Sequence, residues 1–113
     1  MAELELTESV HGSDVVLAPR GDIDLSRSPD LRSSLRRIQD SRAPKRLIVD
    51  LSGVSYMDSS GVATLVEALQ TARKRNSQVI LCGLEPRVRS IFEIARLDTV
   101  FTITGSVKDA LGG

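Results

Sequence analysis

The chain has 113 residues and a formal net charge of zero, and 41 % of its residues are hydrophobic but only 3 % aromatic. A chain of this length can bury an aliphatic core without a metal ion or disulfide bonds, so we expect a single domain over residues 1–113. The balanced charge gives no global attraction to nucleic acid or to a membrane surface, and neither is expected as a partner.

The first residues, MAELELTESV, carry acidic side chains and no apolar run, which does not fit a secretory signal peptide. No segment approaches the roughly 18 apolar residues of a membrane-spanning helix. Cys82 stands alone in the apolar run QVILCG, so it is predicted to be a small buried side chain without a disulfide partner. We therefore expect a soluble cytoplasmic protein that is a monomer or a weak dimer.

The N-terminal part of the chain predicts a β-hairpin. Leu4 and Leu6 alternate with charged residues, as in a strand with one solvated face. The turn-forming segment HGSD, residues 11–14, separates this strand from the apolar segment VVLAPRG. The short separation favours antiparallel pairing of the two strands.

An amphipathic helix is predicted after the hairpin. Ser28 is expected to cap it, with Pro29 at its first position, where no N–H donor is needed. Its apolar residues fall on one helical face, at Leu31, Leu35 and Ile38. Its arginines are predicted to form a solvated face, with a docking patch for an acidic partner as the alternative, and they are Arg32, Arg36, Arg37 and Arg42.

The rest of the chain alternates apolar strands with helices. RLIVDL and QVILCG are short, continuous apolar runs, which indicates strands buried on both faces. Helical periodicity follows DSSG and recurs in EPRVRSIFEIARL, and VFTIT is predicted to be a last strand before a short helix capped by Ser106. The order predicts an α/β fold: an open mixed sheet, built from the N-terminal hairpin plus parallel βα units, with helices packed on it.

Two polar loops stand out in this predicted sheet. GDIDLS, residues 21–26, follows the second strand, and SGVSYMDSSG, residues 52–61, follows the third. Functional loops of open α/β sheets gather beyond the carboxyl ends of the strands. We therefore expect the two loops to be neighbours in space.

The sequence offers no set of residues for catalysis, a cofactor or a metal ion. His11 is the only histidine and lies in the predicted turn, without a second ligand at metal spacing. No phosphate-binding glycine loop and no G-x-S-x-G elbow is present. Asp22 and Asp24 are interpreted as loop carboxylates that bond to nearby backbone N–H groups, with a small Mg²⁺-dependent phosphotransfer enzyme as the alternative.

The segment DSSG, residues 58–61, has the residue types of a helix start. Asp58 or Ser59 can cap the following helix, which places Ser59 and Ser60 in or beside its first turn, and Gly61 permits a tight entry of the chain. Capping chemistry by itself thus predicts an ordinary helix start.

Two motifs carry a resemblance to a known family. GDIDLS and VDLSGVSYMDSSGVATL, residues 49–65, resemble the corresponding segments of the STAS domain of bacterial anti-sigma-factor antagonists, and the similarity extends over nearly the whole chain in element order. The second motif is the more specific, because it joins a strand, a loop and D-S-[ST]-G in fixed order. Many members have a second glycine where this chain has Ala63.

The resemblance implies a regulator without catalytic residues or cofactor. It makes Ser59 the serine that a partner anti-sigma factor, itself a serine kinase, phosphorylates. The unphosphorylated form would bind this kinase and release a sigma factor, and a metal-dependent serine phosphatase would reset the switch. The residues expected at the partner surface are Asp24, Ser26, Asp58, Ser60 and Gly61.

The physical chemistry of a helix start agrees with this implication. Unpaired N–H groups and the helix dipole favour negative charge there, so a phosphoserine should not unfold the domain. The phosphate adds about −1.5 to −2 charge beside Asp58 and changes the surface sharply. The alternative within the same fold is a STAS interaction subunit of a lipid-transport or stressosome complex without this switch.

Overall fold

The computed structural model describes residues 4–112. The helices and strands in chain order are β1 (Glu5–His11), β2 (Asp14–Arg20), α1 (Ser28–Ser41), β3 (Arg46–Asp50), α2 (Ser59–Lys74), β4 (Gln78–Cys82), α3 (Pro86–Ile94), β5 (Thr102–Thr104) and α4 (Val107–Gly112). The predicted α/β order is confirmed.

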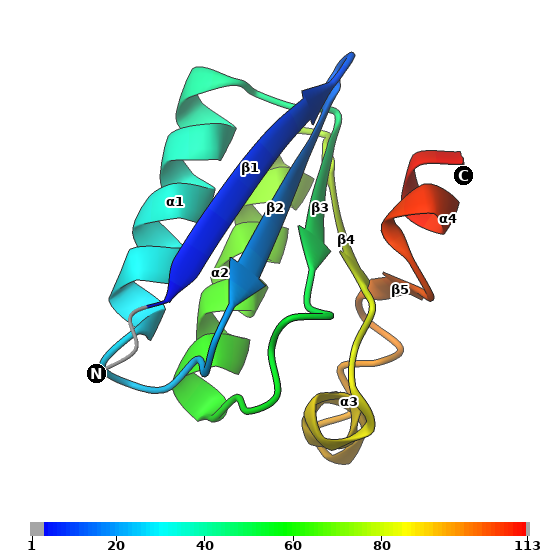
Figure 1. Cartoon of the computed structure of the whole chain (residues 1–113). Helices are drawn as coiled ribbons and strands as arrows, with labels where there is room; N and C mark the ends of the chain where they lie inside the picture. The colour runs from blue at the N-terminus through cyan, green and yellow to red at the C-terminus, as the bar shows by residue number, and fades with distance from the viewer. Residues whose placement is uncertain (1–3, 113) are drawn as a thin grey trace.

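The strands form one mixed sheet in the order β1-β2-β3-β4-β5 (Figure 1). β1 and β2 pair antiparallel through a tight turn in which Gly12 has a φ of 62°, a conformation that glycine adopts without steric cost. The remaining neighbours pair in parallel. The parallel β2–β3 ladder ends at Leu17, before Pro19, which has no N–H to donate.

The main core lies between the sheet and the helices α1, α2 and α3. Alternate residues of the strands point into it, among them Leu17, Leu47 and Leu81, and they meet helix residues such as Leu65 and Phe92, all at 2 % exposure or less. Phe92 of α3 meets Phe101 edge to face, with ring centroids 5.6 Å apart. The aliphatic composition thus yields a core that contains this single aromatic pair within the described residues.

The start of α1 differs from the prediction. Ser28 is the first helical residue rather than the cap, and Arg27 occupies the cap position without a side-chain cap bond. The Asp24 carboxylate instead accepts the N–H of Arg27 at 3.1 Å, while the Ser28 hydroxyl faces the Leu25 carbonyl at 3.5 Å. The prediction was wrong because the N–H groups of Asp30 and Leu31, which a Ser28 cap would accept, donate to the Arg27 carbonyl, so the helix begins one residue earlier.

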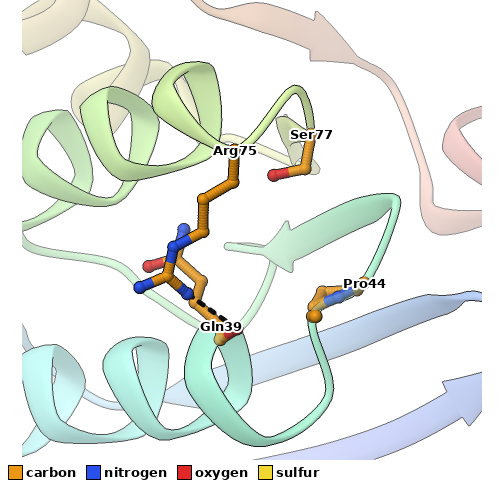
Figure 2. A pocket seen from close by; sticks show the side chains of 5 residues that line it. Gln39, Pro44, Arg75 and Ser77 are labelled. Atoms are coloured by element: carbon orange, nitrogen blue, oxygen red, sulfur yellow. Dashed lines mark hydrogen bonds between the residues drawn. The ribbon is translucent and has the colours of Figure 1, made fainter.

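The far ends of α1 and α2 are tied together by Arg75 (Figure 2). Its guanidinium donates to the Gln39 carbonyl at 2.9 Å and to the Asp40 carboxylate at 2.8 Å. The buried Gln39 amide donates to the Ala68 carbonyl of α2 at 2.9 Å. The first bond satisfies the Gln39 carbonyl near the C-terminus of α1, and together the bonds fix the helix pair at the end of the sheet away from the polar loops.

The four predicted arginines are solvent-exposed, as expected; Arg42 follows α1 as its C-cap, and the three within α1 are also ion-paired. Arg32 and Arg36 both contact Glu67 of α2, and Arg37 contacts Glu8 of β1. Exposed pairs of this kind add little stability. These ion pairs hold Arg32, Arg36 and Arg37 against neighbouring elements, so the three side chains do not form an unpaired basic patch.

α4 covers the opposite face of the sheet (Figure 1). A second cluster there contains Val16, Ile48, Ile80, Cys82 and Ala110. Cys82 is fully buried, as predicted, and burial raises the pKa of its thiol to about 11. The thiol is therefore protonated and shielded while α4 stays docked.

Arg46 fastens α4 to the sheet. Its guanidinium donates to the carbonyls of Ala110 at 2.9 Å and Leu111 at 3.1 Å, and it also donates to the buried Asp14 carboxylate at 2.7 Å. The hydrogen bond from Arg46 is the main cause that lowers the pKa of Asp14. This carboxylate is stabilised in the folded chain at neutral pH, and the stabilisation is lost as the pH falls through the lowered folded-state pKa.

The Arg46 clamp predicts the reactivity of Cys82. Arg46→Ala removes charge-assisted bonds worth about 1.5–3 kcal/mol each, so α4 should open more often and Cys82 should react with a thiol reagent at least about tenfold faster. Arg36→Ala, which removes an exposed ion pair elsewhere, is the matched control. The two variants are compared at equal global stability, adjusted with denaturant. Equal rates of Cys82 modification would then contradict the role of Arg46 in holding α4 on the sheet.

Candidate functional site

The two polar loops lie side by side, as predicted. The N–H of Gly21 donates to the Gly53 carbonyl at 3.1 Å, and the N–H of Ile23 donates to the Tyr56 carbonyl at 3.0 Å. The N–H of Asp58 completes the ladder with a 3.1 Å bond to the Ile23 carbonyl. The loops therefore continue the parallel pairing of β2 and β3 beyond the regular strands.

The register of this pairing determines which loop side chains are buried and which face solvent. Ile23 faces Met57 across a parallel bridge, and both side chains are buried, at 0 % and 1 % exposure. Because alternate residues of an extended chain point to opposite sides, Asp24 and Asp58 emerge on the outer side. Two buried anchors thus hold the loops and turn their carboxylates toward solvent.

Asp58 is the N-cap of α2. Its Oδ1 accepts the backbone N–H of Ser60 at 2.9 Å and the Ser60 hydroxyl at 2.5 Å. Its Oδ2 accepts the N–H of Leu25 at 3.2 Å, from the other loop. One carboxylate thereby caps the helix and fastens the β2–α1 loop to it.

The two serines of DSSG have different surroundings. The Ser60 hydroxyl donates to Asp58, and its carbonyl accepts the Thr64 hydroxyl at 2.8 Å. Ser59 is exposed at the first position of α2, and its hydroxyl makes no hydrogen bond to any residue between 4 and 112. Ser59 is therefore the serine whose oxygen is available to another molecule.

Gly61 is buried where α2 crosses the loop anchors. A Cβ at this position would lie 2.7 Å from Met57 Cγ and 2.8 Å from Ile23 Cγ2. Carbon atoms pack at about 3.5–4.0 Å, so no side chain fits here without displacing the anchors. The absence of a side chain at Gly61 thus sets how closely the helix start approaches the loops.

Asp24 organises the β2–α1 loop. Its Oδ1 accepts the Ser26 hydroxyl at 2.7 Å and the N–H groups of Ser26 and Arg27 at 3.0 and 3.1 Å. Its Oδ2 accepts the Arg27 guanidinium at 2.8 Å. Asp24 therefore bonds to nearby backbone N–H groups, as interpreted from the sequence, and Ser26 is exposed beside it.

Both capping carboxylates are held in their charged form. The Ser60 hydroxyl is the main cause that lowers the pKa of Asp58, with burial opposing it. The Ser26 hydroxyl is the main cause that lowers the pKa of Asp24. At neutral pH both carboxylates are thus charged, and the Arg27 guanidinium pairs with that of Asp24.

The other histidine, cysteine and acidic side chains of residues 4–112 do not gather into a metal site. No group of three or more histidine, cysteine or acidic side chains there could hold a metal ion. His11 contacts only the Ser9 hydroxyl among polar side chains of that range, at 2.9 Å. The Ser55 hydroxyl donates to Asp22 at 3.4 Å. No helix within the same range has the length and apolar character needed to cross a membrane.

Comparison with known families decides the identity of the fold. The model of the STAS domain matches residues 3–110 of the chain. The chain belongs to the STAS domain family. The resemblance based on GDIDLS and the DSSG segment is therefore confirmed.

Known STAS proteins resemble this STAS domain over most of its length. The anti-sigma-B factor antagonist of Listeria monocytogenes is 36 % identical over 83 residues, which cover 74 % of this chain and 72 % of the relative. An anti-sigma factor antagonist from Mycobacterium paratuberculosis superimposes with a TM-score of 0.89 at 23 % identity, covering 97 % of this chain and 92 % of that one. The Bacillus cell fate determinant SpoIIAA, solved in its phosphorylated form, superimposes with a TM-score of 0.74 at 21 % identity and 96 % coverage of both chains.

Two residues of this STAS domain site were missed in the sequence. Leu25 is 75 % exposed and Tyr56 is 50 % exposed, and they lie on the two loops that Asp58 joins. For Tyr56 a sequence signal existed. Successive side chains of an extended segment point to opposite sides, so a buried Met57 implies an exposed Tyr56. Without the Ile23–Met57 pairing, the sequence did not indicate which of the two was buried.

Proposed function

We propose that this STAS domain is an anti-sigma-factor antagonist controlled by phosphorylation of Ser59. The unphosphorylated form binds an anti-sigma-factor serine kinase and frees a sigma factor, and phosphorylation ends that binding. The observation that carries the proposal is the contrast at the start of α2: the Ser59 hydroxyl is exposed and unbonded within the described chain, whereas the Ser60 hydroxyl is held by Asp58.

The names of relatives support this function. The Listeria relative is an anti-sigma-B factor antagonist, at 36 % identity over 74 % of this chain. SpoIIAA, with the same fold, exists in phosphorylated and unphosphorylated forms. The two motifs that carry the family resemblance are also the two loops that the structure brings together around Ser59.

Phosphorylation of Ser59 requires only a hydroxyl group from this chain. The Ser59 oxygen attacks the γ-phosphorus of ATP held by the kinase, the bond from that phosphorus to the β–γ bridging oxygen breaks, and ADP leaves. The hydroxyl proton passes to a base of the kinase. Catalytic groups therefore belong to the partner, and this chain supplies a hydroxyl on a rigid helix start.

The surrounding residues keep that hydroxyl in place. Asp58 and Ser60 fix the helix cap, and Gly61 permits the close approach of α2 to the loop. Asp24 and Ser26 form the neighbouring part of the docking surface. Ala63 is exposed on α2, so a methyl group where many members have glycine can be accommodated by the chain itself.

The product phosphate explains release of the partner. A serine kinase must hold ATP phosphates against Ser59, so the new phosphate lies beside those of ADP in a desolvated interface. Like charges in such an interface cost several kcal/mol. The fold remains intact because a helix start tolerates the phosphate. A metal-dependent serine phosphatase in the cytoplasm restores the binding form.

The proposal is tested by phosphorylation and site mapping. The anti-sigma-factor kinases encoded in the source genome are purified and each is mixed with the chain and Mg-ATP. We expect one to add one phosphate per chain, at Ser59 by mass spectrometry, and Ser59→Ala to remain unlabelled. Stoichiometric labelling of Ser60, or no labelling by any of these kinases, would contradict the proposed switch.

A further inference from the structure

Two apolar side chains lie exposed on the loops that meet at the start of α2, although the fold does not need them there. The large hydrophobic residues exposed within residues 4–112 are Val10, Leu25, Tyr56, Ile94 and Val100. Leu25 and Tyr56 belong to the two loops that meet at Asp58. The same loops already have buried anchors, Ile23 and Met57, so they stay folded without help from the exposed pair.

The position of Tyr56 is fixed rather than accidental. Its carbonyl accepts the N–H of Ile23 at 3.0 Å, and the following residues, Met57 and Asp58, are held by burial and by the Ile23 carbonyl. The ring therefore projects from a rigid backbone on the side of the loop opposite Met57, where Asp58 also emerges. Such an exposed ring can be buried by a partner with little ordering cost.

The charge around the pair restricts what can cover it. The two loops carry three carboxylates, Asp22, Asp24 and Asp58, and Arg27 pairs with Asp24, so the loops keep an excess of negative charge. A second copy of this chain would oppose this acidic ring with the same charges. A partner with an apolar socket and basic residues at its rim fits better.

We propose that Tyr56, flanked by Leu25, is the apolar anchor through which this chain docks on its anti-sigma-factor kinase. The inference rests on the proposed function and adds the residues that supply affinity. Tyrosine is among the residue types that dominate the free energy of protein interfaces. Ser59 then acts as the switch at the interface, and the Tyr56 ring as the contact that positions it.

The chain offers a direct probe of this contact. Tyr56 is the only tyrosine and there is no tryptophan. Incorporation of 3-fluorotyrosine therefore gives one ¹⁹F resonance, which reports on Tyr56 alone. Titration with the unlabelled kinase and ADP should shift or broaden this resonance, and phosphorylation of Ser59 by added ATP should return it to the position of the free phosphorylated chain.

Substitution measures the contribution. We expect Tyr56→Ala to weaken kinase binding at least tenfold and Leu25→Ala about threefold to tenfold in calorimetry, while Tyr56→Phe retains most of the affinity. Val10→Ala is the matched control, since Val10 is similarly exposed near the hairpin turn, at the opposite end of the sheet. Thermal unfolding verifies that each variant is folded.

The outcomes separate this inference from the proposed function. Equal kinase affinity of Tyr56→Ala and wild type, with Ser59 still phosphorylated, would overturn the anchor and leave the switch intact. Loss of affinity in Val10→Ala equal to that in Tyr56→Ala would overturn it as well. Failure of the wild-type chain to bind any anti-sigma-factor kinase of the source genome would overturn both, and a concentration-dependent ¹⁹F shift without kinase would assign the contact to a second copy.

Discussion

Ser59→Ala is expected to bind the anti-sigma-factor kinase in the presence of ATP as tightly as unphosphorylated wild type, and Ser59→Asp about tenfold to a hundredfold more weakly. Phosphorylated wild type should bind about a thousandfold more weakly, which corresponds to ~4 kcal/mol. The order follows from charge: alanine adds none, aspartate adds one negative charge, and phosphoserine adds almost two. Calorimetry with ADP, or with a non-hydrolysable nucleotide, gives the three affinities.

A charge added elsewhere should have little effect on kinase binding. Ser41 is exposed at the last position of α1, and this helix runs away from the loops for its 14 residues. Ser41→Asp should therefore match wild type in affinity. Equal affinities of Ser59→Ala and Ser59→Asp would contradict a charge switch at Ser59. Equal weakening by Ser41→Asp would instead indicate a response to net charge.

Gly61→Ala is expected to destabilise the domain by about 1–3 kcal/mol, because the added methyl overlaps buried side chains in a packed core. Helix propensity alone predicts the opposite sign, since alanine is favoured over glycine by about 1 kcal/mol inside a helix. The structure decides between them: the new Cβ would lie 2.7 Å from Met57 Cγ and 2.8 Å from Ile23 Cγ2. Urea unfolding should show a lower midpoint with an unchanged slope.

The clash can be separated from other effects by a double-mutant cycle. Met57→Ala removes the Met57 Cγ atom, so Gly61→Ala should cost less in that background than in wild type. Ala63→Gly, at an exposed position two residues along α2, measures the helix-propensity contribution nearby. A stabilised Gly61→Ala, or a coupling of zero with Met57→Ala, would contradict the close approach of α2 to the loop.

Local chemistry was a good guide where one feature dominated. The continuous apolar runs RLIVDL and QVILCG became β3 and β4, and the segment HGSD became a two-residue turn. Ser106 caps α4, as predicted, with its hydroxyl accepting the N–H of Asp109 at 3.1 Å. Asn76 takes a left-handed conformation after α2, with a φ of 56°, which asparagine tolerates better than most residues. In each case a short segment has few competing partners.

Prediction failed where the first residue of a helix depended on the path of the preceding loop. Ser28 followed by Pro29 has the residue types of a helix cap, yet the helix begins one residue earlier, with Arg27 at the cap position and its N–H bonded to the Asp24 carboxylate. The choice depends on the path of the β2–α1 loop, which the pairing of Ile23 with Met57 fixes. A cap preference is a local property, whereas that pairing joins residues far apart in the chain.

By itself the sequence determined the order of elements, the mixed sheet and the two loops that carry the family motifs, because apolar periodicity and turn chemistry are local. It also placed two serines at a helix start. The family resemblance singled out Ser59 as the phosphorylated serine, and the tertiary structure supplied the physical difference between the two. Asp58 binds the Ser60 hydroxyl and the N–H of Leu25 at once, and this leaves the Ser59 hydroxyl exposed. That arrangement requires the two loops to meet, and the pairing of β2 with β3 brings them together.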